Sequence, residues 1–188
     1  MGKMAPSIVK GEYKKIPEHY NRDNWVNKRY WSRVTKPYVR RKATLPGNIA
    51  VDPYTGEKFK PKIGHGEHVT SLKEAHESQY EGNMLTPAQK KLFAHNRANL
   101  VLSLPKVNIE KGVHDIANWQ PKKNIVPMAK NIVRTKKRFG LAADLKEYEV
   151  LTDILGDKPD LKVKPKLSNT SYCTRCHVTH SILDSHTK

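Results

Sequence analysis

The sequence predicts a mainly α-helical protein with a small core of about three helices, long irregular extended arms and little or no sheet. Only 37% of the 188 residues are hydrophobic, so the chain can bury only a small core. Twelve prolines interrupt the chain repeatedly, and each disfavours the interior of a helix or strand. Apolar residues recur at helical spacing mainly between residues 83 and 156, which places the expected core there.

Four segments follow from the shifts in composition along the chain. Residues 1–44 are expected to form a basic, aromatic N-terminal arm with a short helix, and residues 45–82 a Gly- and Pro-rich extended loop region. Residues 83–156 are expected to form the small helical core. Residues 157–188 are expected to form an extended C-terminal tail with a cluster of cysteines and histidines.

The core segment carries start and stop signals for three helices. Thr86 and Gln89 form a Thr-x-x-Gln capping box, and Gly140 and Gly156 are suited to end helices. The helices are expected to run from Pro87 to about Ser103, from Pro127 to Phe139 and from Leu141 to Leu155, with an irregular stretch from Lys106 to Asn124. Their buried faces are expected to hold Leu92, Phe93, Leu100, Val101, Leu104, Met128, Ile132, Val133, Phe139, Leu141, Leu145, Tyr148, Leu151 and Leu155.

The N-terminal arm is predicted to hold a helix that Asp23 caps and that runs from about Asn24 to Val34. The apolar stripe of this helix would consist of Val26, Tyr30 and Val34. Lys36-Pro37 is expected to end the helix, because the residue before a proline disfavours helical backbone angles. Tyr38 to Lys42 would then continue as an extended basic arm.

The loop region carries two local signals. Asp52–Gly56 is typical of a tight turn, with a proline that fixes one backbone angle and a glycine that closes the turn. A capping box at Ser71 and Glu74 predicts a short helix over residues 71–80. The histidines at 65, 68 and 76 lack the His-Glu-x-x-His spacing that places two imidazoles on one helical face. We therefore expect surface histidines in a turn there.

The charge of the chain is large and unevenly distributed. Lys and Arg number 35 against 18 Asp and Glu, which gives a formal net charge of +17. Residues 1–44 carry twelve bases and three acids, and residues 121–140 carry seven bases and no acid. An excess of this size needs a polyanion nearby. Nucleic acid, an anionic membrane surface and an acidic protein surface are the candidates.

The stretch from Tyr20 to Lys42 interleaves cations with aromatic residues. Cations neutralise phosphates, and aromatic rings and Arg planes stack on bases, so this combination favours RNA. Trp25 and Trp31 are suited either to stacking on bases or to a core. The expected RNA-binding residues are Arg22, Lys28, Arg29, Arg33, Lys36, Arg40, Arg41, Lys42, Lys130, Arg134, Lys136, Lys137 and Arg138.

The basic helix expected at 127–139 is followed by an acidic one at 141–155. On a phosphate surface the basic helix would face the partner and the acidic helix would face away. Alternatively the two helices pair with each other, although exposed ion pairs contribute only about 0–1 kcal/mol each. The sequence leaves both arrangements open.

The tail carries a cluster of potential metal ligands, and three interpretations stand. A zinc ion held by Cys173, Cys176, His180 and His186 is the first, although knuckle glycines are missing. Covalent haem on the Cys-x-x-Cys-His pattern is the second, but the polar tail offers no apolar pocket for haem. Two unligated thiols are the third. No cofactor is certain on this basis.

Several classes of protein are disfavoured. No apolar run is long enough to span a membrane, and the first residues lack the apolar core of a signal peptide. Two cysteines argue against a secreted disulfide scaffold. No phosphate-binding loop, nucleophile elbow or placeable carboxylate pair occurs. We therefore do not expect an enzyme.

In its small helical core and basic extended arms the chain resembles, as a type, the accessory proteins of large ribonucleoproteins. The resemblance implies a non-catalytic, structural, rRNA-binding subunit among neighbouring proteins, and we expect a lineage-specific protein of a mitochondrial ribosome in the matrix. Two alternatives remain. One is a protein bound to an acidic lattice such as tubulin, inside a ciliary microtubule or in the cytoplasm. The other is an accessory subunit of a respiratory complex.

Overall fold

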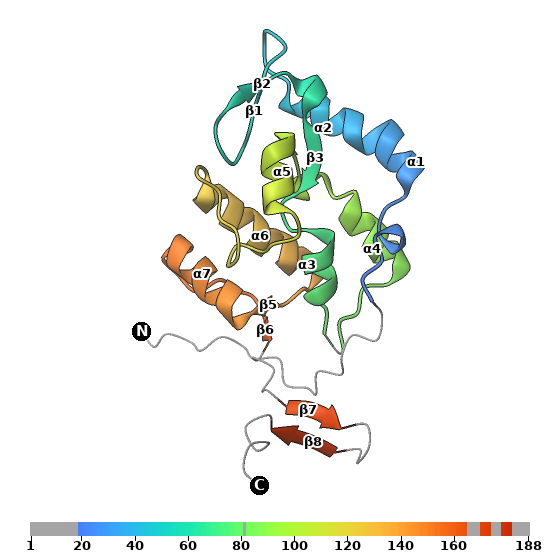
Figure 1. Ribbon diagram of the computed structural model, residues 1–188, viewed down its shortest axis with the longest axis vertical. Coiled ribbons are helices and arrows are strands. Elements are labelled where there is room, and N and C mark those ends of the chain that lie inside the picture. The colour runs from blue at the N-terminus through green and yellow to red at the C-terminus, as the bar shows by residue number, and fades with distance from the viewer. Residues whose placement is uncertain (1–18, 81, 165–169, 174–177, 182–188) are drawn as a thin grey trace.

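The computed structural model describes residues 19–80 and 82–164, together with the backbone of two short strands at 170–173 and 178–181 (Figure 1). Within these residues the protein is mainly helical, and the only sheets are two-stranded and short. The α-helices are α1 (Lys28–Tyr30), α2 (Lys36–Ala43), α3 (Leu72–Glu77), α4 (Pro87–Ala94), α5 (Pro105–Lys111), α6 (Ile125–Phe139) and α7 (Leu145–Leu155). The expected class is confirmed, but the described residues hold more helices than the three expected.

The strands form four separate pairs. They are β1 (Ala50–Val51) with β2 (Lys58–Phe59), β3 (His65–His68) with β4 (Leu100–Ser103), β5 (Ala143–Asp144) with β6 (Val163–Lys164), and β7 (Thr170–Cys173) with β8 (Val178–Ser181). Only the β5–β6 pair is parallel. Short 3₁₀ turns occur at η1 (Arg22–Asn24), η3 (Pro61–Ile63) and η4 (Arg97–Asn99).

The N-terminal helix is longer than expected and begins later. It starts at Lys28 because the Asn27 side chain, rather than Asp23, accepts a hydrogen bond from a backbone N–H of the first turn, that of Tyr30, at 3.0 Å. It passes through a π-helical turn, η2 (Trp31–Thr35), and continues as α2 to Ala43. We call residues 28–43 the helical rod. Tyr38 to Lys42 are therefore helical, and the expected extended arm is wrong at this point.

The π turn explains why Pro37 does not end the rod. A proline has no N–H, and its ring clashes with the carbonyl four residues earlier in an α-helix. In the π turn the Lys36 N–H bonds to the Trp31 carbonyl, five residues back, which shifts the hydrogen-bond register just before the proline. The wider turn accommodates the ring. Consequently the expected apolar stripe is only partly realised: Val26 is buried before the rod begins, whereas Tyr30 and Val34 are 45% and 39% exposed.

The segment expected to be an extended loop, residues 45–82, contains β1, β2, β3 and α3 and buries many side chains. The tight turn at Asp52–Gly56 is confirmed, since the Asp52 carboxylate accepts hydrogen bonds from the Tyr54 and Thr55 amides at 2.9 Å. The other carboxylate oxygen of Asp52 accepts from Ser103 Oγ at 2.8 Å and from the Leu104 amide at 2.7 Å. One buried aspartate thus attaches this turn to β4.

The helix expected from Pro87 to Ser103 is divided. It ends at Ala94, the Asn96 side chain caps η4, and Leu100–Ser103 forms β4. β4 pairs with β3 in antiparallel register, with His68 opposite Leu100. Pro105, expected to stop a helix, occupies the first position of α5. Part of the irregular stretch expected from Lys106 to Asn124 is therefore helical.

The predicted capping boxes and glycine helix ends are confirmed. Both capping boxes form, at Ser71 with Glu74 and at Thr86 with Gln89. Gly140 and Gly156 end α6 and α7 with φ angles of 65° and 74°, in the left-handed region that favours glycine.

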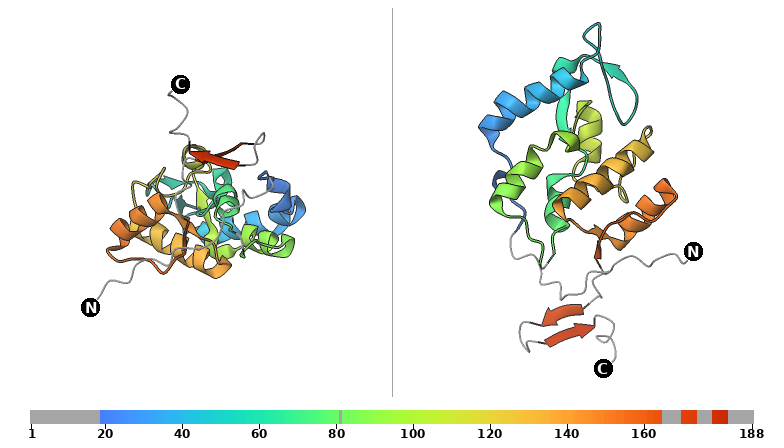
Figure 2. Two further views of the ribbon diagram at one scale, coloured as in Figure 1. Left: turned by 90° about the horizontal axis from the view of Figure 1, so that it is seen from below. Right: turned by 180° about the vertical axis from the view of Figure 1, so that it is seen from behind.

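The core lies between the rod, α4, α5, α6 and α7 in two apolar clusters. The larger joins α6 and α7 to β4 and α5, and the smaller packs Trp25, Phe93 and Phe139 together. Most residues expected on buried faces are inside. Leu92 and Leu145 are not: they are 56% and 41% exposed among the described residues. Figure 2 shows α6 and α7 side by side, as their contacts require.

Charged side chains are buried in this core as well. The Lys111 ammonium of α5 lies 3.1 Å from Glu67 of β3 and donates to the His68 carbonyl at 3.1 Å. The Glu67 carboxylate also accepts from the Tyr54 hydroxyl at 3.3 Å. Burial raises the pKa of Glu67 despite the opposing charge of Lys111. This ion pair links α5 to the β3–β4 pair.

A second buried network joins three helices. The Lys136 ammonium of α6 lies 2.7 Å from Glu147 of α7 and 3.3 Å from Glu74 of α3. It also donates to Ser78 Oγ at 2.9 Å and to the Ala142 carbonyl at 3.2 Å. Burial alone would lower the pKa of Lys136, but attraction to the two carboxylates outweighs it and raises that pKa. Of the two arrangements that the sequence left open, the structure shows an ion pair between the basic and the acidic helix, and that pair is buried rather than exposed.

Replacing Lys111 with Met is expected to lower the free energy of unfolding by about 3–5 kcal/mol, because the Glu67 carboxylate would stay buried without its cation. Lys106, also on α5, pairs with Glu57 at 2.8 Å on the surface. Lys106→Met is therefore the matched control and should leave stability nearly unchanged. Urea unfolding measures both. Equal effects of the two substitutions would contradict a special role for the buried pair, and the double variant K111M/E67M should recover part of the loss.

The Glu147 network predicts a pH effect. Burial and the nearby Glu74 carboxylate raise the pKa of Glu147 above its ordinary 4.5, although Lys136 opposes the shift. The folded protein then holds a proton that the unfolded chain releases, so this group lowers the free energy of unfolding as pH rises above 4.5. Glu147→Gln removes that titration. The stability of the variant relative to wild type should therefore increase as pH rises from about 4.5 to about 8, the pKa of Glu147 in the fold.

Urea unfolding at several pH values measures this difference. Glu149→Gln, an exposed position on the same helix, is the control and should run parallel to wild type. Parallel curves for Glu147→Gln as well would show that Glu147 ionises normally in the fold.

Candidate nucleic-acid interface

The helical rod carries most of the predicted N-terminal RNA-binding residues on its surface. Lys28, Arg29, Arg33, Arg41 and Lys42 are exposed, and Lys36 and Arg40 are half-buried. Arg22 is exposed as well, in η1 before the rod. The rod runs along one edge of the molecule (Figure 1), so its exposed side is open along its length.

Two of these cations already have intramolecular partners. Lys28 pairs with Asp23 at 3.0 Å on the surface. The Arg40 guanidinium donates to the Lys62 carbonyl at 2.8 Å, which ties the rod to η3. Both contacts are compatible with binding of a phosphate. The sequence does not indicate the contact of Arg40 with the Lys62 carbonyl.

The second basic block lies on α6. Lys130, Arg134, Lys137 and Arg138 are exposed there. Lys136 is not: its side chain is 0% exposed and is held by Glu74 and Glu147. Its predicted role in RNA binding is therefore wrong, because the ammonium group has no access to a phosphate.

Arg97 of η4 joins the two basic blocks. Its guanidinium carbon lies 4.2 Å from the centre of the Tyr38 ring on α2. On the other side of η4, Asn131 of α6 donates to the Ala98 carbonyl at 2.7 Å and Arg138 donates to Asn96 Oδ1 at 3.4 Å. The η4 turn thus bridges α2 and α6. Sequence reasoning missed Arg97, which lies outside both basic blocks, and no local signal marks it.

Helical spacing shows which other cations lie on the same faces of α2 and α6 as the contacts with η4. Arg41 and Lys42 follow Tyr38 by three and four residues, so they lie on the same side of α2. Arg134 is three residues after Asn131 and four before Arg138, so it lies on the side of α6 that faces η4. We call Arg41, Lys42, Arg97, Arg134 and Arg138 the Arg97 ridge. The fold brings together here cations that are up to 97 positions apart in sequence.

The tryptophans of the N-terminal stretch belong to the core. Trp25 is buried and packs edge-to-face on Phe93, with ring centres 5.6 Å apart. Trp31 is half-buried and stacks on His68 at 5.3 Å. The core interpretation therefore holds for Trp25, and neither ring is presented to a base as an open platform.

The histidines expected in a surface turn include two that are buried. His68 lies in β3 with its Nε2 2.8 Å from the Ala94 carbonyl, and burial lowers its pKa to about 4. His76 is buried in α3. Only His65 of the three is exposed. His65–His68 form a strand because β4 supplies a partner, which the sequence around them does not reveal.

The expected zinc ligands fall mostly beyond what the structure describes. Cys176 and His186 lie outside the described residues, and only the backbone is described for Cys173 in β7 and His180 in β8. The zinc interpretation stays a prediction. Among residues 19–80 and 82–164, no group of three or more His, Cys, Asp or Glu side chains is arranged to hold a metal ion.

No helix in the described part of the chain is both long and apolar enough to cross a membrane. No family model, curated protein or solved structure matches this chain.

The contact between Tyr38 and Arg97 can be measured through stability. A double-mutant cycle with Tyr38→Leu and Arg97→Met should give a coupling free energy of about 0.5–1 kcal/mol, as expected for a cation over an aromatic ring at an exposed site. Tyr30→Leu, which removes a ring in the same rod that faces His95 instead, is the control partner for Arg97→Met. Equal coupling in both cycles would contradict the bridge.

Proposed function

We propose that the protein is a non-catalytic, RNA-binding structural subunit of a large ribonucleoprotein. The observation that supports this most directly is the Arg97 ridge. Two basic blocks, each of which could be an ordinary solvated face, contribute to one surface through η4. Closely spaced cations on one surface can neutralise successive phosphates of a nucleic-acid backbone.

The distribution of charge adds to this proposal. The buried charged residues in the described part of the chain are four acids, Asp52, Glu67, Glu74 and Glu147, and three lysines, Lys90, Lys111 and Lys136. The buried acids and lysines are similar in number, so the interior contributes little to the net charge of the protein. The other Lys and Arg residues in the described part of the chain are exposed or half-buried, and their charge at the surface attracts a polyanion.

The narrower form of the proposal is an accessory protein of a mitochondrial ribosome, bound to rRNA and to neighbouring proteins in the matrix. It rests on the net charge of the chain and on its two basic blocks, which suit a protein that lies between RNA helices. Sedimentation of native extract with and without nuclease tests it. Co-sedimentation with a ribosomal particle that nuclease disperses is expected, whereas nuclease-resistant co-purification with tubulin would overturn it.

The ridge predicts how salt affects binding of the purified protein to RNA. The triple variant R41Q/R97Q/R134Q should bind more weakly than wild type. The slope of log K against log salt concentration should become shallower by about 0.7 for each single-strand phosphate contact that is lost. Fluorescence anisotropy with a labelled RNA oligonucleotide over a series of salt concentrations measures both quantities.

The control triple variant is K73Q/K106Q/K146Q. It removes the same number of charges, but from lysines that lie near Glu77, Glu57 and Asn118. Its salt slope should stay close to that of wild type. If the two triple variants reduce the slope equally, binding depends only on net charge and the ridge is not the interface.

A further inference from the structure

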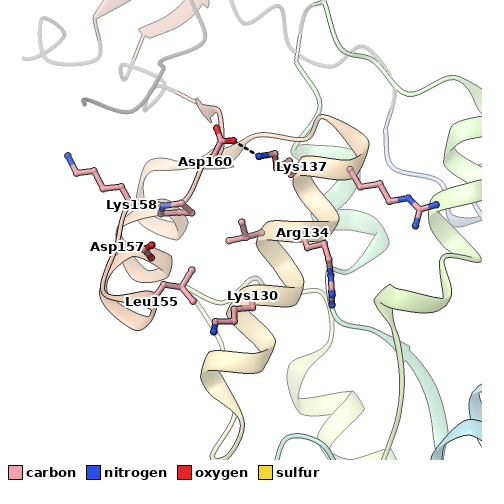
Figure 3. Close-up of a pocket in the computed structure, with 10 residues that line it drawn as sticks. Lys130, Arg134, Lys137, Leu155, Asp157, Lys158 and Asp160 are labelled. Atoms are coloured by element: carbon pink, nitrogen blue, oxygen red, sulfur yellow. Dashed lines mark hydrogen bonds and ion pairs between the residues drawn. The ribbon is translucent and has the colours of Figure 1, made fainter. Parts of the chain in front are cut away.

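A groove runs beside the ridge, between α6 and the chain that follows α7 (Figure 3). Its volume is about 810 Å³, within the range of about 300–1,000 Å³ that is common for small-ligand sites. Lys130 lies toward one end of α6, and Lys137 pairs with Asp160 toward the other (Figure 3). Seven residues separate these two lysines, which is about 10 Å along a helix axis.

The walls of the groove combine apolar surface with positive charge. Val133 and Leu155 are half-buried and Pro159 is buried, so together they offer an apolar floor. Five cations and two aspartates line the remainder. Lys137 is neutralised by Asp160. Lys130 and Arg134 have no carboxylate partner among the residues that the structure describes, so they are available to an anionic ligand.

These features together restrict the class of ligand. An apolar floor alone would accept any hydrophobic group, and exposed cations alone would accept any phosphate. A ligand that satisfies both carries an apolar group attached to a phosphate. Asp157, which also lines the groove, adds an acceptor for an exocyclic amino group. A nucleotide has all three parts.

We propose that this groove binds one nucleotide, with its base against Val133 and Leu155 and its phosphate on Lys130 and Arg134. The proposal rests on the proposed function, in that an unstacked nucleotide of bound RNA is the expected source. Arg134 belongs both to the ridge and to the groove, so a strand that follows the ridge can place one base in the groove. A free mononucleotide shares the same chemistry and is the other source.

Two measurements separate these sources. In the first, AMP is titrated into isotopically labelled protein, and the methyl signals of Val133 and Leu155 are followed by NMR. In the second, a single-stranded RNA that contains 4-thiouridine is cross-linked to the protein by light, and mass spectrometry locates the cross-links. We expect shifts of both methyl signals with AMP and cross-links within residues 130–138 or 155–160.

Two variants test the assignment. Leu155→Glu places a negative charge on the apolar floor, and Lys130→Gln removes a phosphate contact without changing the floor. Each should weaken AMP binding by about tenfold or more, since each opposes or removes a charged contact. Leu92→Glu, at an exposed leucine of α4, and Lys146→Gln are the matched controls and should leave AMP binding unchanged. Thermal unfolding shows whether Leu155→Glu is folded. If it is not, the effect of Lys130→Gln on AMP binding tests the assignment by itself.

The outcomes distinguish this proposal from the proposed function. RNA binding with cross-links only outside the groove, and no AMP shifts, would overturn the groove and leave the RNA-binding function standing. AMP binding at the groove without RNA binding would support the groove and overturn RNA as the partner. Loss of groove cross-links in Leu155→Glu, with overall RNA affinity reduced less than about threefold, would support both. Binding of neither probe would overturn the groove.

Discussion

The buried ammonium group of Lys136 is the interaction on which the arrangement of the helices depends. It lies within 3.3 Å of carboxylates from α3 and α7 while its own backbone belongs to α6. A buried charge is strongly destabilising unless it is paired and hydrogen-bonded. Pairing of this lysine with both glutamates requires the three helices to meet at one point. Lys111 and Glu67 impose a similar constraint on α5 and β3.

These internal pairs have a consequence for the surface. They place carboxylates in the core, where they neutralise lysines that would otherwise add to the exterior charge. What remains outside is an excess of cations with few acids to neutralise them, most of all on the rod and on α6. Self-repulsion of such a surface opposes the compact state until a polyanion binds. The carboxylates buried in the core and the positive charge of the surface are therefore two results of the same distribution of charged residues.

Much of the local structure could be predicted because its causes are local. The two capping boxes, the Asp52 turn and the glycines at 140 and 156 depend on contacts between residues at most four positions apart. The predictions were wrong where contacts outside the local pattern determine the secondary structure of a segment. Leu100–Ser103 is a strand because His65–His68 pairs with it, and the rod continues through Pro37 because a π turn precedes it. Neither partner nor turn is encoded by the pattern of the segment itself.

The candidate interface likewise has features that the sequence determined and features that only the tertiary structure determined. The sequence alone determined the excess of cations, the two blocks that hold most of them and the helical spacing that exposes Lys130, Arg134, Lys137 and Arg138. It could not separate Lys136 from these neighbours, because helical spacing does not show which face meets two glutamates from other helices. It also could not select Arg97. Only the tertiary structure decided that the short turn that carries Arg97 bridges the two blocks, since that role depends on contacts of the turn with Tyr38 and with α6.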